Sequence, residues 1–254
     1  MERAAPVGEP RDPGPPPAAP DRAAAHAFVA DLADPVLDDE DRHHLERVLR
    51  LQPGQTVTVS DGAGTWRACR WVAGGRLEAV GVPVAGPSAG PTVTIAFALT
   101  KGERPEWVVQ KLTEVGVDRI VPFRAARSVV RWDENRAADQ VERWRRVARQ
   151  AAMQSRRARL PVVDEVQGFA LVAAGAGGAA GALAAPGGGY PSTGLRMLLV
   201  GPEGGWSEDE AGCGLDLVGL GPGVLRAETA AVAAGVVLCG LRDGMIRAHG
   251  DRSL

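Results

Sequence analysis

The chain has 254 residues, a formal net charge of −2 and an apolar content of 45%, which is ordinary for a globular protein with one large or two smaller domains. Its three cysteines form no C-x-x-C pair, which argues against a disulfide framework or a zinc cluster and favours a reducing cytoplasm. No segment approaches the roughly 18 apolar residues of a membrane span, and the N-terminus lacks an apolar signal core.

The first third of the chain changes composition twice. Residues 1–24 are rich in Pro, Ala, Gly and charge, which predicts a disordered tail or a start assigned too far upstream. Residues 25–88 are β-rich. They begin with a short amphipathic helix over 41–51, in which Leu45, Val48 and Leu49 share one face. Short strands separated by glycine turns then predict a small barrel, with strands at 56–60, 65–72 and 76–82. Residues 86–91 are typical of a linker.

Residues 91–254 alternate between strand and helix. Helices are expected over 105–115 and 134–155, and apolar strands over 92–99, 119–123, 162–163 and 196–200. This alternation predicts an α/β domain with a parallel sheet covered by helices.

The Ala/Gly-rich stretch 170–194 is predicted to be a flexible loop. Residues 175–180 within it match G-x-G-x-x-A. A dinucleotide site is rejected because Pro186 and the following glycines would break any helix, and no acidic residue lies about 20 positions on.

Two glycine-rich turns are candidate ligand loops. Residues 200–210 and 220–231 each read as a strand end, a tight turn and a helix start, and this arrangement brings backbone N–H groups close to a ligand. Neither loop is a Walker loop or a G-x-G-x-x-G fingerprint. The helix over 228–241 is almost wholly apolar, so it should pack inside the domain or against a second subunit. Core packing does not explain Arg226 and Glu228 at its start.

A basic segment runs from Arg124 to Arg159, with 11 arginines against 4 acidic residues, or +7. The rest of the chain is therefore −9, because −2 − 7 = −9. This asymmetry favours a polyanion on one face; the alternative is a solvated helix face with Glu142 and Arg146 paired. His43 and His44 point in different directions on a helix, so they do not form a chelating pair and are expected to be surface residues. The alternatives are a metal site or, together with Arg47 and Arg50, a phosphate-facing patch.

Several motifs keep the order found in one family. They are Lys101-Gly102-Glu103-Arg104, Gln110-Lys111-Leu112-Thr113-Glu114-Val115-Gly116-Val117, Arg127-Ser128-Val129-Val130, Glu142-Arg143-Trp144, Ala151-Ala152-Met153-Gln154-Ser155-Arg156-Arg157, Gly201-Pro202-Glu203-Gly204-Gly205 and Leu225-Arg226-Ala227-Glu228-Thr229-Ala230. From about His26 to the C-terminus the chain resembles the ribosomal RNA small subunit methyltransferase E family of SPOUT methyltransferases. The family commonly has Glu where Gln150 stands, and Arg-Met where Arg104-Pro105 stands.

The resemblance implies a PUA-like RNA-binding barrel over 25–88 and a trefoil-knotted SPOUT domain over 91–254. It implies S-adenosylmethionine as cofactor, no metal and a cytoplasmic homodimer. The implied reaction is methylation of N3 of uridine 1498 in the 16S rRNA of the small ribosomal subunit. Because N3 is paired in a duplex, the target base must be unpaired or flipped out.

The resemblance and the loop chemistry together assign the site residues. The cofactor residues are expected to be Leu199, Val200, Gly201, Gly204, Leu220, Gly221, Val224, Leu225, Arg226 and Thr229. Arg226 is the candidate for stabilising the uracil anion, and Glu203 or Glu228 could accept the proton. The RNA-binding candidates are His44, Arg47, Arg50, Lys101, Arg104, Arg127, Arg131, Arg156 and Arg157. Two other functions stay open: a SPOUT ribose 2′-O-methyltransferase and a non-catalytic RNA-binding ribosome-assembly factor.

Overall fold

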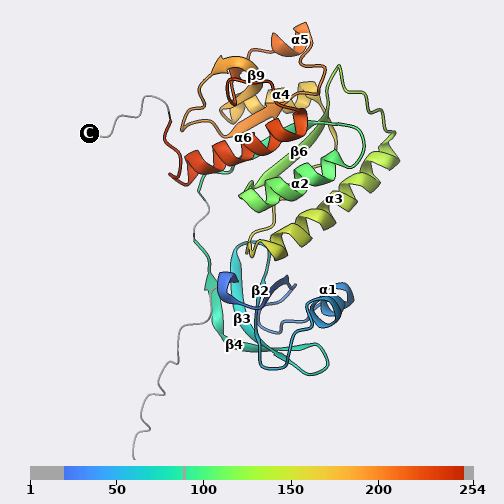
Figure 1. The fold of residues 1–254 in the computed structure, drawn as a ribbon, viewed down its shortest axis with the longest axis vertical. Helices are drawn as coiled ribbons and strands as arrows, with labels where there is room; N and C mark the ends of the chain where they lie inside the picture. Colours follow the sequence, from blue (N-terminus) through green and yellow to red (C-terminus); the bar gives the residue numbers. More distant parts are fainter. Residues whose placement is uncertain (1–19, 88–89, 249–254) are drawn as a thin grey trace, which may run out of the picture.

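The computed structural model describes residues 20–87 and 90–248, which form a small lower part and a larger upper part in Figure 1. Residues 1–19 of the predicted tail lie outside the described residues. The remainder of that tail is structured, because Pro20–Arg22 forms a 3-10 turn, η1, and Ala23 is buried. Within the described ranges, no helix is long and apolar enough to cross a membrane.

The small part is built on a four-stranded sheet. Its strands are β1 (Ala25–Phe28), β2 (Thr56–Ser60), β3 (Thr65–Val72) and β4 (Arg76–Ala85), in the order β1-β2-β3-β4. β1 is parallel to β2, and the other pairs are antiparallel. The turn between β3 and β4 uses Gly74 and Gly75, whose φ angles of 77° and 72° are those that a tight hairpin turn requires. The predicted strands are present, and β4 is longer than expected.

The predicted helix over 41–51 is divided into two pieces. α1 (Asp39–His43), capped by Asp38, continues into a π-helical turn, η2 (His44–Val48). Leu45 is buried, but Val48 is 61% exposed and Leu49 is 47% exposed. The expected common apolar face is therefore wrong. A π turn holds more residues than an α turn, which moves positions three and four residues on away from the face of Leu45.

His26 on β1 is a buried histidine that should make stability depend on pH. Its Nδ1 lies 2.9 Å from Thr58 Oγ1, and burial, together with the nearby Arg156 guanidinium, lowers its pKa to about 4. Because the unfolded chain binds this proton at about pH 6.5, the contribution of His26 is complete above that pH and is lost towards pH 4.

We therefore expect the difference in unfolding free energy between wild type and His26→Gln to fall by about 3 kcal/mol from pH 7 to pH 4. Urea unfolding of both proteins at several pH values measures it. A difference that stays constant with pH would contradict the assignment of a neutral His26.

The large part contains a parallel sheet. Its strands are β5 (Thr94–Ala98), β6 (Arg119–Arg124), β7 (Val162–Val163), β8 (Gln167–Gly168), β9 (Gly181–Gly189), β10 (Met197–Val200) and β11 (Asp216–Val218). They are arranged β11-β9-β10-β5-β6-β7, with β8 also pairing with β6, and every pairing is parallel. The predicted parallel α/β architecture is confirmed.

Helices cover both faces of this sheet (Figure 1). α2 (Arg104–Val115), α3 (Glu134–Gln154) and α6 (Ala227–Arg242) pack on one face, and α4 (Phe169–Gly178) packs on the other. α5 (Glu208–Ala211) is a single turn. The strands alternate between the two cores, so Leu198 and Val200 face α2 and α6 whereas Met197 and Leu199 face α4. The apolar helix α6 packs inside the domain: Gly235 lies against Leu112 of α2, where a Cβ would come within 2.8 Å of the leucine side chain.

The prediction of a flexible loop over 170–194 is wrong, because this stretch contains a helix and an interior strand of the sheet. α4 occupies its first part, and β9 lies between β10 and β11. Small side chains suit this place, since a Cβ on Gly188 would lie 2.7 Å from the backbone of β11. The composition that suggested a loop is instead the composition of a closely packed strand.

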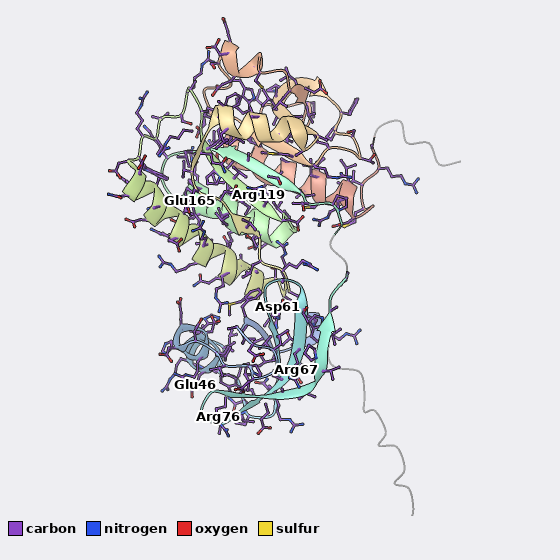
Figure 2. All side chains as sticks on the ribbon, turned by 180° about the vertical axis from the view of Figure 1, so that it is seen from behind. Glu46, Asp61, Arg67, Arg76, Arg119 and Glu165 are labelled. Carbon is purple, nitrogen blue, oxygen red and sulfur yellow. The ribbon has the colours of Figure 1, made fainter. Side chains whose placement is uncertain are left out.

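The two parts share a packed junction at the C-terminal end of α3. Ala152 and Met153 complete the apolar core of the small part. Arg149 donates to Phe28 O at 3.2 Å and to Asp41 Oδ2 at 2.5 Å. In Figure 2, Asp61 marks the end of the small part nearest the large one, and Arg76 lies at the far end. The small part is therefore anchored directly to a helix of the large part.

Candidate functional site

A cleft of about 160 Å³ lies at the carboxyl ends of β10 and of the edge strand β11, beside the middle of β9. The carboxyl edge of a parallel sheet is where α/β proteins bind ligands. The lining comes from the middle of β9, the end of β10, the loops after β10 and β11 and the start of α6: Ala184, Ala185, Pro186, Val200, Gly201, Pro202, Glu203, Gly205, Trp206, Leu220, Gly221, Gly223, Val224, Leu225, Ala227 and Ala230.

Trp206 fixes the first loop. Its Nε1 donates to Ala184 O at 2.9 Å, and its ring stacks parallel to Phe123 with the centroids 6.1 Å apart. Gly201 packs tightly against this ring, because a Cβ there would lie 3.0 Å from the Trp206 side chain. The loop ends at Ser207, the N-cap of α5, which forms a capping box with Glu210. Glu210 is also buried and accepts from Ala126 N at 2.7 Å.

Replacing Trp206 by Ala should damage both fold and cleft. The indole is partly buried, so we expect a loss of about 3 kcal/mol of unfolding free energy, at the low end for deletion of a large aromatic side chain. Loss of its bond to Ala184 also frees the loop, so ligand affinity should fall about tenfold or more. Urea unfolding and calorimetric titration of the cofactor measure the two effects. Unchanged affinity would show that the loop holds its shape without Trp206.

Six of the ten predicted cofactor residues line the cleft: Val200, Gly201, Leu220, Gly221, Val224 and Leu225. Leu199 does not, because strand alternation turns its side chain into the core beneath α4. Gly204, Arg226 and Thr229 lie in the same loops but outside the lining. Ala184, Ala185 and Pro186 were not predicted from the sequence, because their strand β9 lies in a stretch that was expected to be a loop. Trp206 carried a usable signal, as an aromatic residue inside a glycine turn.

Two of the three catalytic candidates, Glu203 and Glu228, meet at Arg104 beside this cleft. Arg104 Nη1 lies 2.7 Å from Glu203 Oε1, and Arg104 Nε lies 3.6 Å from Glu228 Oε1. Glu228 is the more buried carboxylate, with a side chain 15% exposed against 41% for Glu203. Its Oε2 is buried and has no hydrogen-bond partner in the described part of the chain. Arg226 is exposed at the N-cap of α6.

The predicted RNA-binding residues divide into two groups. The first group is exposed: His44, Arg47, Arg50, Lys101 and Arg131. The second is engaged within the protein: Arg104 as above, Arg127 with Gly204 O at 2.9 Å, Arg156 with Ala24 O at 2.9 Å, and Arg157 with Thr113 O at 2.7 Å.

The surroundings of Arg157 do not fit its predicted role in RNA binding. Its side chain is only 15% exposed, and burial lowers the pKa of its guanidinium, although Asp118 opposes this. It also donates to Val117 O at 3.1 Å. Arg157 therefore satisfies carbonyl groups at the end of α2 and is not available to bind RNA.

The long basic helix is partly neutralised by neighbours. Arg143 pairs with Glu106 of α2, and Arg145 pairs with Glu142 and Glu165. Glu142 thus contacts Arg145 rather than the predicted Arg146. Across residues 20–87 and 90–248, no group of three or more His, Cys, Asp or Glu side chains is placed to hold a metal ion.

The cleft is chemically suited to an adenosine-type ligand. Its lining is apolar apart from backbone groups and Glu203, which fits an aromatic ring read by main-chain donors and acceptors. The carboxylates at the mouth fit a ligand that carries a positive charge. The cleft volume is smaller than that of typical small-molecule sites, which begin at about 300 Å³. A whole cofactor would therefore extend past the enclosed region or move the loops apart.

Comparison with known proteins relates the sequence to RNA methyltransferases. Residues 88–238 match the model of an RNA methyltransferase domain, and residues 37–80 match an RNA methyltransferase PUA domain. The ribosomal RNA small subunit methyltransferase E of Mycobacterium tuberculosis is 37% identical over 227 residues, covering 78% of this chain and 83% of that protein. The same enzyme of Bacillus subtilis is 30% identical over 218 residues, covering 77% and 85%.

Solved structures extend the likeness to the fold. The ribosomal RNA small subunit methyltransferase E of Neisseria gonorrhoeae, solved with S-adenosylmethionine, is 27% identical with a TM-score of 0.72, covering 85% of this chain and 97% of that chain. A Legionella pneumophila protein solved with the same cofactor is 27% identical with a TM-score of 0.74, covering 84% and 96%. The domain match, the relatives and the cleft agree: the chain belongs to the ribosomal RNA small subunit methyltransferase E family and is an S-adenosylmethionine-dependent methyltransferase with a PUA-like domain.

Proposed function

We propose that this protein methylates N3 of uridine 1498 in the 16S rRNA of the small ribosomal subunit, acting in the cytoplasm. The carrying observation is the position of Glu203 and Glu228 beside Arg104 at the mouth of the cleft formed by the loops after β10 and β11. A base-methylating enzyme needs a proton acceptor at that place, because uracil N3 loses a proton as it gains the methyl group. The names of the relatives support small-subunit rRNA as the substrate.

Glu228 is our choice for the proton acceptor. Its Oε2 is shielded from water and has no donor to satisfy it in the described structure, so a substrate N–H would supply the missing partner. The cofactor supplies an electrophilic methyl group. Arg226, at the N-cap of α6, stabilises the negative charge that develops on the uracil oxygens. Val200, Leu220 and Leu225 hold the cofactor ring between apolar side chains.

The assembly and the knot are part of the same proposal. The surface around α6 exposes Val224 (86%), Val236 (45%), Met245 (83%) and Ile246 (38%), which supports a homodimer that covers this apolar patch. The insertion of β10 between β9 and β5 and the adjacent loops after β10 and β11 are compatible with a trefoil knot in the domain over 91–254. Sedimentation should give twice the chain mass. Val236→Glu together with Met245→Glu should give single chains.

Cofactor binding and product identity test the proposal. Calorimetry should give one S-adenosylmethionine bound per chain. Small subunits isolated from a strain lacking the gene should then accept one methyl group per 16S rRNA. A 2′-O-methyl nucleoside in the digest would assign the ribose-methylating alternative instead. Absence of cofactor binding would favour the non-catalytic assembly factor.

A further inference from the structure

A groove of about 1020 Å³ lies between the small part and the helices α2 and α3. We call it the interdomain groove. One wall is the segment 40–49 of the small part, which carries Glu46, labelled in Figure 2. The other wall comes from α2 and α3 at helical spacing: Glu103, Glu106, Trp107, Gln110, Val147, Gln150, Ala151 and Gln154.

The groove reaches the start of α2, which is in contact with the cofactor cleft through Arg104. Glu103 lines it at the start of α2, and the next residue, Arg104, contacts Glu203 and Glu228 at the mouth of the cofactor cleft. Material that lies in the groove is therefore next to material that enters the cleft. The proposed substrate is a polynucleotide, so neighbours of the target nucleotide are the natural occupants.

The chemistry inside the groove suits a nucleobase rather than a phosphate. Trp107 is 43% exposed, with a flat apolar face available, and the π-helical segment adds the exposed Val48 and Leu49. Bases stack on such surfaces whatever their sequence. The groove also holds four carboxylates: Glu40, Asp41, Glu103 and Glu106. Arg149 and Arg143 pair with Asp41 and Glu106, so Glu40 and Glu103 face the single arginine of the lining, Arg156, and the interior keeps a small excess of negative charge that disfavours a phosphate.

Three amide side chains provide the means to read a base. Gln110 comes from α2, and Gln150 and Gln154 stand one helical turn apart on α3. An amide offers both a donor and an acceptor, which matches the polar edge of a nucleobase. Arg156 lines the same groove. Its backbone has a φ of 60°, and its Nη1 is buried without an acceptor in the described part of the chain.

We propose that the interdomain groove is a base-recognition subsite, which takes an unpaired nucleobase of the RNA beside the target, stacks it on Trp107 and reads its edge with Gln110, Gln150 and Gln154. The phosphates then follow the exposed arginines outside the groove, such as Arg47. This inference rests on the proposed function, because it requires an RNA substrate. It assigns to Gln150 a role that needs both the donor and the acceptor of an amide side chain.

The test compares single-stranded RNA 12-mers of adenylate, uridylate and cytidylate with an abasic 12-mer of equal phosphate number, by fluorescence anisotropy on the full chain. Wild type should bind the base-bearing RNAs about tenfold or more tightly than the abasic one, as expected for stacking. Trp107→Ala should lose that difference and keep its affinity for the abasic RNA. Gln150→Leu should reduce the differences among the three bases. Gln140→Leu, on α3 but outside the groove, is the matched control.

Two outcomes overturn the proposal. One is an equal loss of affinity for base-bearing and abasic RNA in Trp107→Ala, and the other is no loss of affinity at all, both in a variant with an unchanged melting temperature. Methylation of small subunits by wild type is measured in parallel. Its failure would refute the proposed function while leaving base-dependent binding as a separate result.

Discussion

Glu228→Gln should lower the rate of methyl transfer about 100-fold or more while leaving the S-adenosylmethionine dissociation constant within about threefold of wild type. The size is that of a lost general base. Cofactor binding should survive because Glu228 is not among the residues that line the cleft, and Gln keeps the shape of the side chain. The measurement pairs single-turnover methylation of small subunits with calorimetric titration of the cofactor.

Glu203→Gln is the matched control for that experiment. Both carboxylates contact Arg104, but Glu203 is more exposed and water can satisfy it. We therefore expect a loss of less than about tenfold from Glu203→Gln. The reverse order of the two variants would transfer the role of base to Glu203. Equal, small losses in both would remove general-base catalysis by carboxylates from the mechanism.

Arg226→Ala should reduce the rate about 100- to 1000-fold, which is typical of removing one group that stabilises a developing oxyanion. The residue begins α6 with an extended backbone at the N-cap and makes no side-chain capping bond, so its removal should change the unfolding free energy little. Arg226→Lys keeps the positive charge and should recover part of the rate. A variant Arg226→Ala with near-wild-type rate and altered cofactor affinity would place Arg226 in cofactor binding instead.

Much of the fold was predictable because its signals are local. The apolar runs at β5, β6 and β10 and the Pro105 and Gly116 signals at the ends of α2 identify elements with few alternatives. β9 could not be predicted in the same way. A strand of Gly and Ala has no apolar or β-branched signature, and its stability comes from parallel pairing with β10 and β11.

The site was predictable only in part for a related reason. Glycine turns identify the two loops in the sequence. Which side chains face the cleft depends on strand alternation and on how the loops pack in the folded chain. Leu199 and Val200 are adjacent in sequence and face opposite cores. Charge counting likewise overstated the RNA surface, because arginines such as Arg157 satisfy carbonyl groups within the protein.

The most direct test of the central claim is the product itself. Small subunits lacking the modification are incubated with the protein and isotope-labelled S-adenosylmethionine, and the 16S rRNA is digested for nucleoside mass spectrometry and mapped by primer extension. The prediction is one labelled 3-methyluridine per 16S rRNA and a single new stop at uridine 1498, both formed about 100-fold or more slowly with Glu228→Gln. Label in a 2′-O-methyl nucleoside, at another position, or in no nucleoside at all would contradict it.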